Sequence, residues 1–171
     1  MKPDKEGFLY PEIDESKCVE CSACLKVCPI KQFRKGENDF TAFAAKSNNK
    51  EIRHESTSGG IFTHLAKAVI SNGGVVVGAA FDEEFNVKHI VIENDKDIKK
   101  ISGSKYVQSS TQGIYKKIKE LLNTGKTVMF SGTPCQIRAL KSYLDKNYDN
   151  LILIDLFCHG VPSPKIWQRY L

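Results

Sequence analysis

The chain has 171 residues, of which 41% are hydrophobic and 26% charged, and its formal net charge is +5. This length suits about one globular domain with a small appendage, and the composition excludes a disordered chain, a collagen and a coiled coil. The longest apolar runs, Val75–Phe81 and Leu151–Cys158, are far shorter than the roughly 20 residues of a membrane-spanning helix. The basic residues are scattered, which indicates solvated helix faces and not a nucleic-acid-binding patch.

The first third of the chain shows little periodicity. Residues 1–37 are rich in cysteine, and a polar boundary follows at residues 38–50, within which Phe40–Ala45 is a candidate short strand. Met1–Tyr10 mixes charged residues with proline and lacks the apolar stretch of a secretory signal. We therefore expect a cytoplasmic protein.

From Ser56 onward the pattern becomes that of an α/β fold, with a mixed α+β arrangement as the variant. Apolar residues recur at helical spacing, and β-branched runs bounded by glycine and asparagine indicate buried strands. In chain order the sequence predicts a helix from Ile61 to Asn72, strands Val75–Phe81 and Phe85–Ile92, a short helix Asp95–Ile101, a polar loop Ser102–Ser110, a helix from Ile114 to Asn123, a strand Thr127–Phe130, a helix Pro134–Leu144, a strand Leu151–Phe157 and a helix from Ser163. Because that last helix has only begun at Leu171, we expect a chain truncated at its C-terminal end.

Four of the six cysteines form one compact motif, Cys18-x-x-Cys21-x-x-Cys24-x-x-x-Cys28, followed by proline. In a chain without a secretory signal such a cluster favours metal binding over disulfides. The spacing is that of a bacterial ferredoxin 4Fe–4S segment. Structural zinc is the alternative, but zinc sites usually join two cysteine pairs, or cysteine and histidine, across a longer loop.

The number of clusters stays open at this point. In two-cluster ferredoxins the fourth cysteine of such a run binds the other cluster, so Cys28 completes either the same cluster or a second one. Cys135 and Cys158 are the remaining thiols. Each is equally well explained as a small buried residue, and a cysteine–histidine hydrolase built on Cys135, Cys158 and His159 would not explain the ferredoxin-like run. His54, His64 and His89 have no partner in sequence, and we expect them at the surface or in helix caps.

Three glycine- and serine-containing loops are candidate ligand sites. Ser58, Gly59 and Gly60 precede a helix, whose free amides can bind an anion, although serine-rich helix starts are common without any ligand. In the loop Ser102–Ser110, Lys105 could meet a phosphate or a flavin anion, Tyr106 could stack on a ring and Gln108 could bond a polar edge. A solvated connection explains that loop equally well. The third loop, Thr133-Pro134-Cys135-Gln136, follows a strand, at the edge where α/β sheets bind ligands.

Together these loops resemble the beta subunits of coenzyme F420-reducing hydrogenases and dehydrogenases. The matching stretches are Ser58–Gly60, Gly103–Ser109, Gly132–Gln136 and Cys158–Pro164, and with the cysteine run they cover nearly the whole chain. The resemblance implies a small ferredoxin-like segment (1–37), a linker (38–50), the N-terminal domain of the family (51–127) and the start of its C-terminal domain (128–171).

The resemblance also implies a function. It predicts an iron–sulfur flavoprotein oxidoreductase subunit that moves electrons between a 4Fe–4S cluster and FAD, with a small molecule or coenzyme as substrate and a protein subunit as electron donor or acceptor. Ser58, Gly59 and Gly60 would bind the pyrophosphate, Lys105, Tyr106 and Gln108 would contact flavin or phosphate, and Thr133–Gln136 would approach the isoalloxazine. No residue is assigned a catalytic role. The alternative is a non-catalytic ferredoxin-like module of a larger complex.

Overall fold

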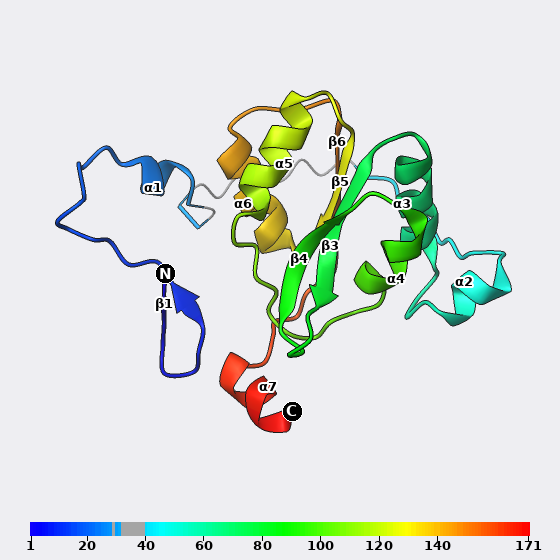
Figure 1. Cartoon of the computed structure of the whole chain (residues 1–171), viewed down its shortest axis with the longest axis horizontal. Coiled ribbons are helices and arrows are strands. Elements are labelled where there is room, and N and C mark those ends of the chain that lie inside the picture. The colour runs from blue at the N-terminus through cyan, green and yellow to red at the C-terminus, as the bar shows by residue number, and fades with distance from the viewer. Residues whose placement is uncertain (29, 32–39) are drawn as a thin grey trace.

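The computed structural model describes residues 1–28, 30–31 and 40–171, which include two sheets and helices on both faces of the larger one (Figure 1). The elements in chain order are β1 (Lys2–Pro3), β2 (Leu9–Tyr10), α1 (Ala23–Lys26), α2 (Lys50–His54), α3 (Ile61–Ser71), β3 (Val75–Phe81), β4 (Val87–Ile92), a 3-10 turn η1 (Asp95–Asp97), α4 (Ile98–Ile101), α5 (Ile114–Asn123), β5 (Val128–Gly132), α6 (Pro134–Leu144), β6 (Leu151–Asp155) and α7 (Pro164–Tyr170).

The larger sheet has the strand order β4-β3-β5-β6. β3 and β4 form an antiparallel hairpin, and β3, β5 and β6 run parallel, with Val77 opposite Phe130 and Phe130 opposite Leu153. Parallel neighbours require a crossover, and α5 and α6 provide them. The carboxyl ends of β3, β5 and β6 therefore lie at one edge of the sheet.

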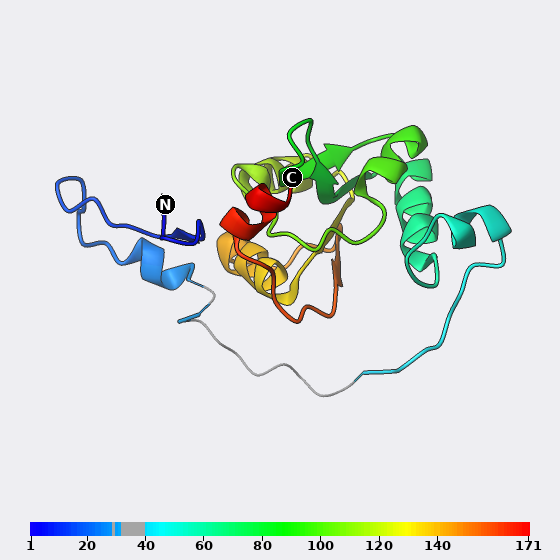
Figure 2. The ribbon, with the colours of Figure 1, turned by 90° about the horizontal axis from the view of Figure 1, so that it is seen from below.

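Both faces of the sheet are covered, which explains why β3 and β5 read as continuous apolar runs. Because successive side chains of a strand point to opposite faces, Val75, Val77, Val128 and Phe130 pack against α5 and α6. On the other face Val76 and Met129 pack with α3 and α4. Figure 2 shows the sheet between these two helical layers.

The N-terminal segment lies apart from the sheet and meets the rest of the chain at α7 (Figure 1). The backbone N–H of Lys165 donates to the carbonyl of Glu6 at 3.2 Å. α7 also contacts the β3–β4 turn. Trp167 stacks on Phe81 with ring centroids 6.2 Å apart and donates its indole N–H to the Phe85 carbonyl at 3.0 Å. The last helix thus connects the cysteine-bearing segment to the sheet.

Most of the elements expected after Ser56 are confirmed, and α3, β3, α5 and α6 fall where the periodicity places them. β4 begins two residues later than predicted, because Phe85 adopts a left-handed φ of 57° in the turn. β6 ends two residues earlier, at Asp155, which pairs with the last residue of β5.

The strand expected at Phe40–Ala45 is wrong. This stretch has no regular structure, and the side chains of Phe40 and Phe43 are each 85% exposed, since no neighbouring strand pairs with it. The hairpin β1–β2, α1 and α2 were not foreseen, because each is too short to show a period. The predicted boundary between the segment 1–37 and the linker 38–50 falls within residues 32–39, which lie outside the described residues.

Candidate functional site

The four clustered cysteines lie on one short segment that includes α1, with Cys24 in this helix and Cys28 after it. Cys18, Cys21 and Cys24 are exposed and Cys28 is half-buried. Glu20 and Ser22, which lie between the first and third cysteine, both adopt left-handed φ values, 53° and 56°. Left-handed geometry costs a non-glycine residue roughly 1–2 kcal/mol, which a bound group could offset.

The donors suit an iron–sulfur cluster in kind and number. Four thiolates at this spacing are the ligand set of a 4Fe–4S cluster. Among the residues that the structure describes, no three Cys, His, Asp or Glu side chains are gathered as a metal site. The motif provides the four thiolate donors that such a cluster needs.

A pocket of about 340 Å³ opens at the carboxyl edge of the sheet, on the face covered by α3 and α4. Its wall combines hydroxyl groups with apolar side chains and carries no charged residue. The lining residues are Ser56, Thr57, Ser58, Gly60, Ile61, Phe62, Thr63, Leu65, Ile101, Ser102, Gly103, Ser104, Ser131, Ile154 and Leu156. Two candidate loops thus meet here, and the hydroxyls of Thr57 and Ser104 approach to 3.5 Å.

Of the ten predicted cofactor contacts, only Ser58 and Gly60 line this pocket. Gly59 serves the packing of the chain instead: a Cβ there would lie 2.6 Å from the carbonyl oxygen of Ala45, and its own carbonyl accepts the Ser47 N–H at 2.7 Å. Gly60 needs glycine for its φ of 80°. The two glycines therefore shape the loop before α3, whether or not an anion binds it.

The predicted contacts of the second loop lie outside the pocket lining. Lys105 caps the C-terminal end of α4, donating from Nζ to the carbonyls of Ser102 at 2.7 Å and Lys100 at 3.2 Å. Burial lowers the pKa of this ammonium group below its usual value. Tyr106 is 79% exposed, and Gln108 is exposed as well, so both side chains are accessible to a ligand at the surface.

The third loop begins α6. Gln136 closes a capping box, its Oε1 accepting the Thr133 N–H at 3.0 Å, while its Nε2 donates to the Ser109 hydroxyl at 2.8 Å. This side chain thus links the second and third loops. Cys135 is exposed, and its sulfur lies 3.0 Å from the Thr133 hydroxyl.

Cys158 follows the carboxyl end of β6, and Cys135 follows that of β5. Because β5 and β6 are parallel neighbours, the two cysteines lie at the same edge of the sheet, which the cysteine–histidine alternative requires. Both thiols are exposed, so the alternative that they are small buried residues is wrong. The Gly160 N–H donates to the Cys158 sulfur at 3.4 Å.

The sequence analysis assigned no ligand contact to Ser131, Ile154 or Leu156, which lie at the ends of β5 and β6 and line the pocket. It was also wrong about His89, which is only 7% exposed and stacks on Phe130 at 5.1 Å. His89 Nε2 lies 3.0 Å from the Ser131 carbonyl and donates to it, while its Nδ1 is buried without a partner in the described part of the chain. Burial lowers the pKa of this imidazole. The sequence could not reveal this burial, because His89 lies in β4 and Phe130 in β5, and these two strands are not neighbours in the sheet.

Comparison with known protein families decides the relationship. Residues 42–116 match the family described as coenzyme F420 hydrogenase/dehydrogenase, beta subunit N-term, and residues 125–171 match the corresponding C terminus. The chain belongs to this beta subunit family. The resemblance seen in the four loops is thereby confirmed. β3 and β4 come from the first matched range and β5 and β6 from the second, and all four form one sheet.

Residues 9–30 match a 4Fe-4S binding domain, so the N-terminal part of this beta subunit family member is an iron–sulfur segment. A similar solved structure is a chain of the F420-reducing [NiFe] hydrogenase complex from Methanosarcina barkeri, with 25% sequence identity and a TM-score of 0.57. The match covers 72% of this chain and 45% of that one. Curated protein sequences give no significant match. No helix in the described residues has the length and apolar character needed to cross a membrane.

Proposed function

We propose that this beta subunit family member is an electron-transfer subunit of an oxidoreductase complex, in which the N-terminal segment holds a 4Fe–4S cluster and the pocket at the sheet edge binds FAD. The observation that carries the proposal is the pairing of a 4Fe-4S binding segment with a family domain of the hydrogenase/dehydrogenase beta subunits in one chain.

The cluster would be held by Cys18, Cys21, Cys24 and Cys28. A 4Fe–4S cluster supplies one-electron transfer when bound. The chain's own contribution is a set of mostly exposed thiols, which a cluster and a partner protein can both reach. α7 contacts the N-terminal segment at Glu6 through Lys165, and the β3–β4 turn at Phe85 through Trp167.

The pocket fits the ring portion of a flavin better than the whole dinucleotide. Its volume of about 340 Å³ is near the lower end of small-molecule sites, and apolar walls with a few hydroxyls suit a flat conjugated ring. The hydroxyls of Ser58 and Ser104 would bond its polar edges, and Phe62 would contact its face. FAD supplies hydride and single-electron chemistry when bound. Tyr106 and Gln108 stay accessible for the remaining part of the ligand.

A second function is favoured by a different observation. Lys105 and Gln136, two of the residues predicted to contact a cofactor, direct polar side-chain groups to protein atoms, which is the arrangement expected of a non-catalytic electron-transfer module. Such a module would contain iron, lack flavin and reduce a partner protein.

The cluster is tested by counting iron and acid-labile sulfide in anaerobically reconstituted protein. We expect about four irons per chain, and Cys24→Ala to lose them, while the control Cys158→Ala keeps them. About eight irons would show a second cluster, and zinc without iron in protein never exposed to air would overturn the assignment.

The flavin site is tested by titrating FAD and following its fluorescence. Ser104→Trp fills the pocket and should abolish FAD binding. The control is Ser71→Trp, at the C-terminal end of α3 and away from the residues of α3 that line the pocket; it should leave FAD binding intact. Equal FAD binding by both variants would show that the flavin does not bind in this pocket. Absence of binding to the unaltered protein, with iron present, would favour the non-catalytic module.

A further inference from the structure

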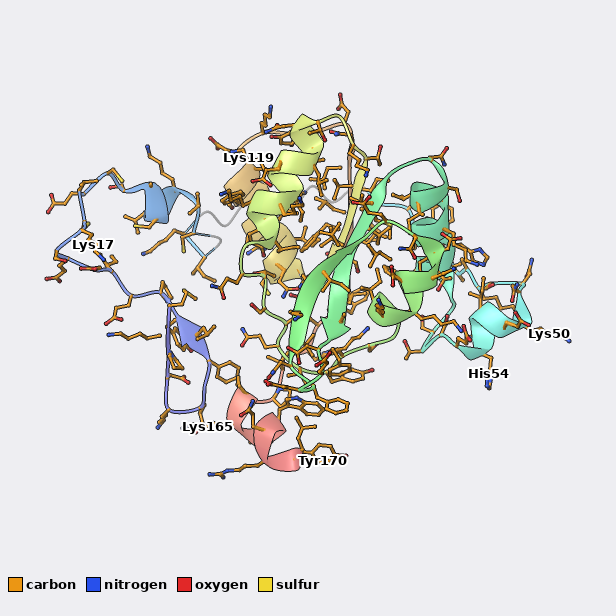
Figure 3. The ribbon with its side chains drawn as sticks, in the orientation of Figure 1. Lys17, Lys50, His54, Lys119, Lys165 and Tyr170 are labelled. Carbon is orange, nitrogen blue, oxygen red and sulfur yellow. The ribbon has the colours of Figure 1, made fainter. Side chains whose placement is uncertain are left out.

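A second and separate cavity of about 580 Å³ lies at α2, and it is strongly basic. Its lining consists of Lys46, Ser47, Asn48, Lys50, Arg53 and His54. Four of these six residues are basic and none is acidic. Figure 3 shows Lys50 and His54 projecting outward from α2, on the side of the molecule away from the N-terminal segment.

Local structure explains why these side chains share one surface. Ser47 is buried, its N–H bound to the Gly59 carbonyl and its hydroxyl 2.8 Å from His64 Nε2. The residues on either side, Lys46 and Asn48, are exposed, as alternation around a buried residue requires. Asn49 caps α2 through the N–H groups of Glu51 and Ile52.

On α2 itself the basic residues are spaced for proximity. Lys50 lies three residues before Arg53 and four before His54, and residues at these spacings are neighbours on a helix surface. The permanent positive charges of Lys50 and Arg53, at this spacing, repel each other and weaken the helix. Proteins tolerate such locally destabilising arrangements of charge mainly at functional sites.

Nearby acids do not neutralise this charge. Glu55 is already paired with Lys99, whose Nζ lies 2.7 Å from Glu55 Oε1. Glu51 is exposed and is not part of the lining. Among the described residues, neither Lys46 nor Lys50 has an ion-pair partner. Arg53 donates from Nη1 to the Ser58 carbonyl, which fixes the guanidinium and leaves its other donors for a ligand.

We propose that this basic pocket binds a diphosphate group, either free pyrophosphate or the phosphates of a nucleoside diphosphate, at a site distinct from the proposed flavin pocket. Three permanent positive charges, those of Lys46, Lys50 and Arg53, match the roughly three negative charges of a diphosphate at neutral pH. An arginine fork and two ammonium groups are the donors that phosphate oxygens prefer. The cavity is larger than one phosphate needs.

The test is isothermal titration calorimetry of the full chain, purified anaerobically, with sodium pyrophosphate at low salt. We expect one saturable site. Lys46→Gln/Lys50→Gln should weaken binding about tenfold, because it removes two of the three permanent positive charges that would contact the diphosphate. Lys116→Gln/Lys117→Gln removes the same charge from exposed positions on α5 and should change the affinity less than twofold.

Equal weakening by the two double variants would overturn the proposal, since it would reveal only general charge attraction. The absence of saturable binding would overturn it too. ADP binding more tightly than pyrophosphate supports a nucleotide as the natural ligand, and equal affinities support free pyrophosphate.

Iron content and FAD titration of the same samples separate this proposal from the proposed function. Pyrophosphate binding that persists in FAD-saturated protein, or in protein that binds no FAD, supports a distinct site. Binding that FAD abolishes would overturn it, because the basic pocket would then belong to the flavin site.

Discussion

Gly59→Ala tests whether the loop before α3 is held by packing. The new Cβ would lie 2.6 Å from the Ala45 carbonyl oxygen, whereas real Cβ contacts keep at least 3.0 Å. The backbone must therefore shift by several tenths of an ångström. Overpacking of this kind costs about 1–3 kcal/mol, and losing the 2.7 Å Ser47–Gly59 hydrogen bond adds about 1 kcal/mol. We expect a total loss of about 1.5–3.5 kcal/mol, after roughly 0.5 kcal/mol is regained from the less flexible unfolded chain.

The assay is urea denaturation under anaerobic conditions, with Gly125→Ala as the control. Gly125 has a φ of 81°, and no atom lies within 4 Å of the position that a Cβ would take there, so its substitution isolates the backbone cost of about 1 kcal/mol. Because Ser58 and Gly60 line the pocket, Gly59→Ala should also weaken FAD binding, and Gly125→Ala should not. A cost for Gly59→Ala no larger than that of Gly125→Ala would refute the packing argument.

Three further predictions concern other parts of the fold. Burial lowers the pKa of His89 below its unfolded value. The unfolded state therefore binds more protons than the folded state as pH falls below about 6.5, and the free energy of unfolding decreases there. Urea midpoints across pH 5–8 should show this decrease, and His89→Gln should reduce it. Gln136→Ala removes the 2.8 Å bond to Ser109 and should raise hydrogen exchange in the loop 102–110 while costing about 1–2 kcal/mol; unchanged exchange would contradict the link. Trp167→Ala removes the indole bond to Phe85 and should expose residues 156–163 to limited proteolysis, whereas Trp167→Phe, which keeps the stacking on Phe81, should expose them less.

Much of the fold was predictable because its signals are local. The apolar spacing of α3 and α5, the β-branched run of β3, and the proline at the start of α6 each depend on residues within one element. The ferredoxin-like run is equally local, because its cysteines are separated by two or three residues. Short elements such as α2 were not predicted, because its five residues are too few to show a helical period.

The candidate site depended on contacts that sequence patterns do not contain. Ser58 and Gly60 were found because they precede a helix, but Ser131 and Leu156 line the pocket only because β5 and β6 are parallel neighbours. The contacts of Lys105 with the carbonyls of Ser102 and Lys100 at the end of α4 were likewise not visible in the sequence, and its contact with a ligand stays a prediction.

The sequence by itself determined the family, the iron–sulfur segment and the principal helices and strands, because motif spacing and periodicity are properties of neighbouring residues. Tertiary structure decided the strand order, the burial of His89 and the gathering of the hydroxyl-lined pocket, because each depends on residues dozens of positions apart. Gly59 shows the difference most directly: its sequence context suggests a phosphate loop, while the approach of Ala45 explains why no larger residue fits there.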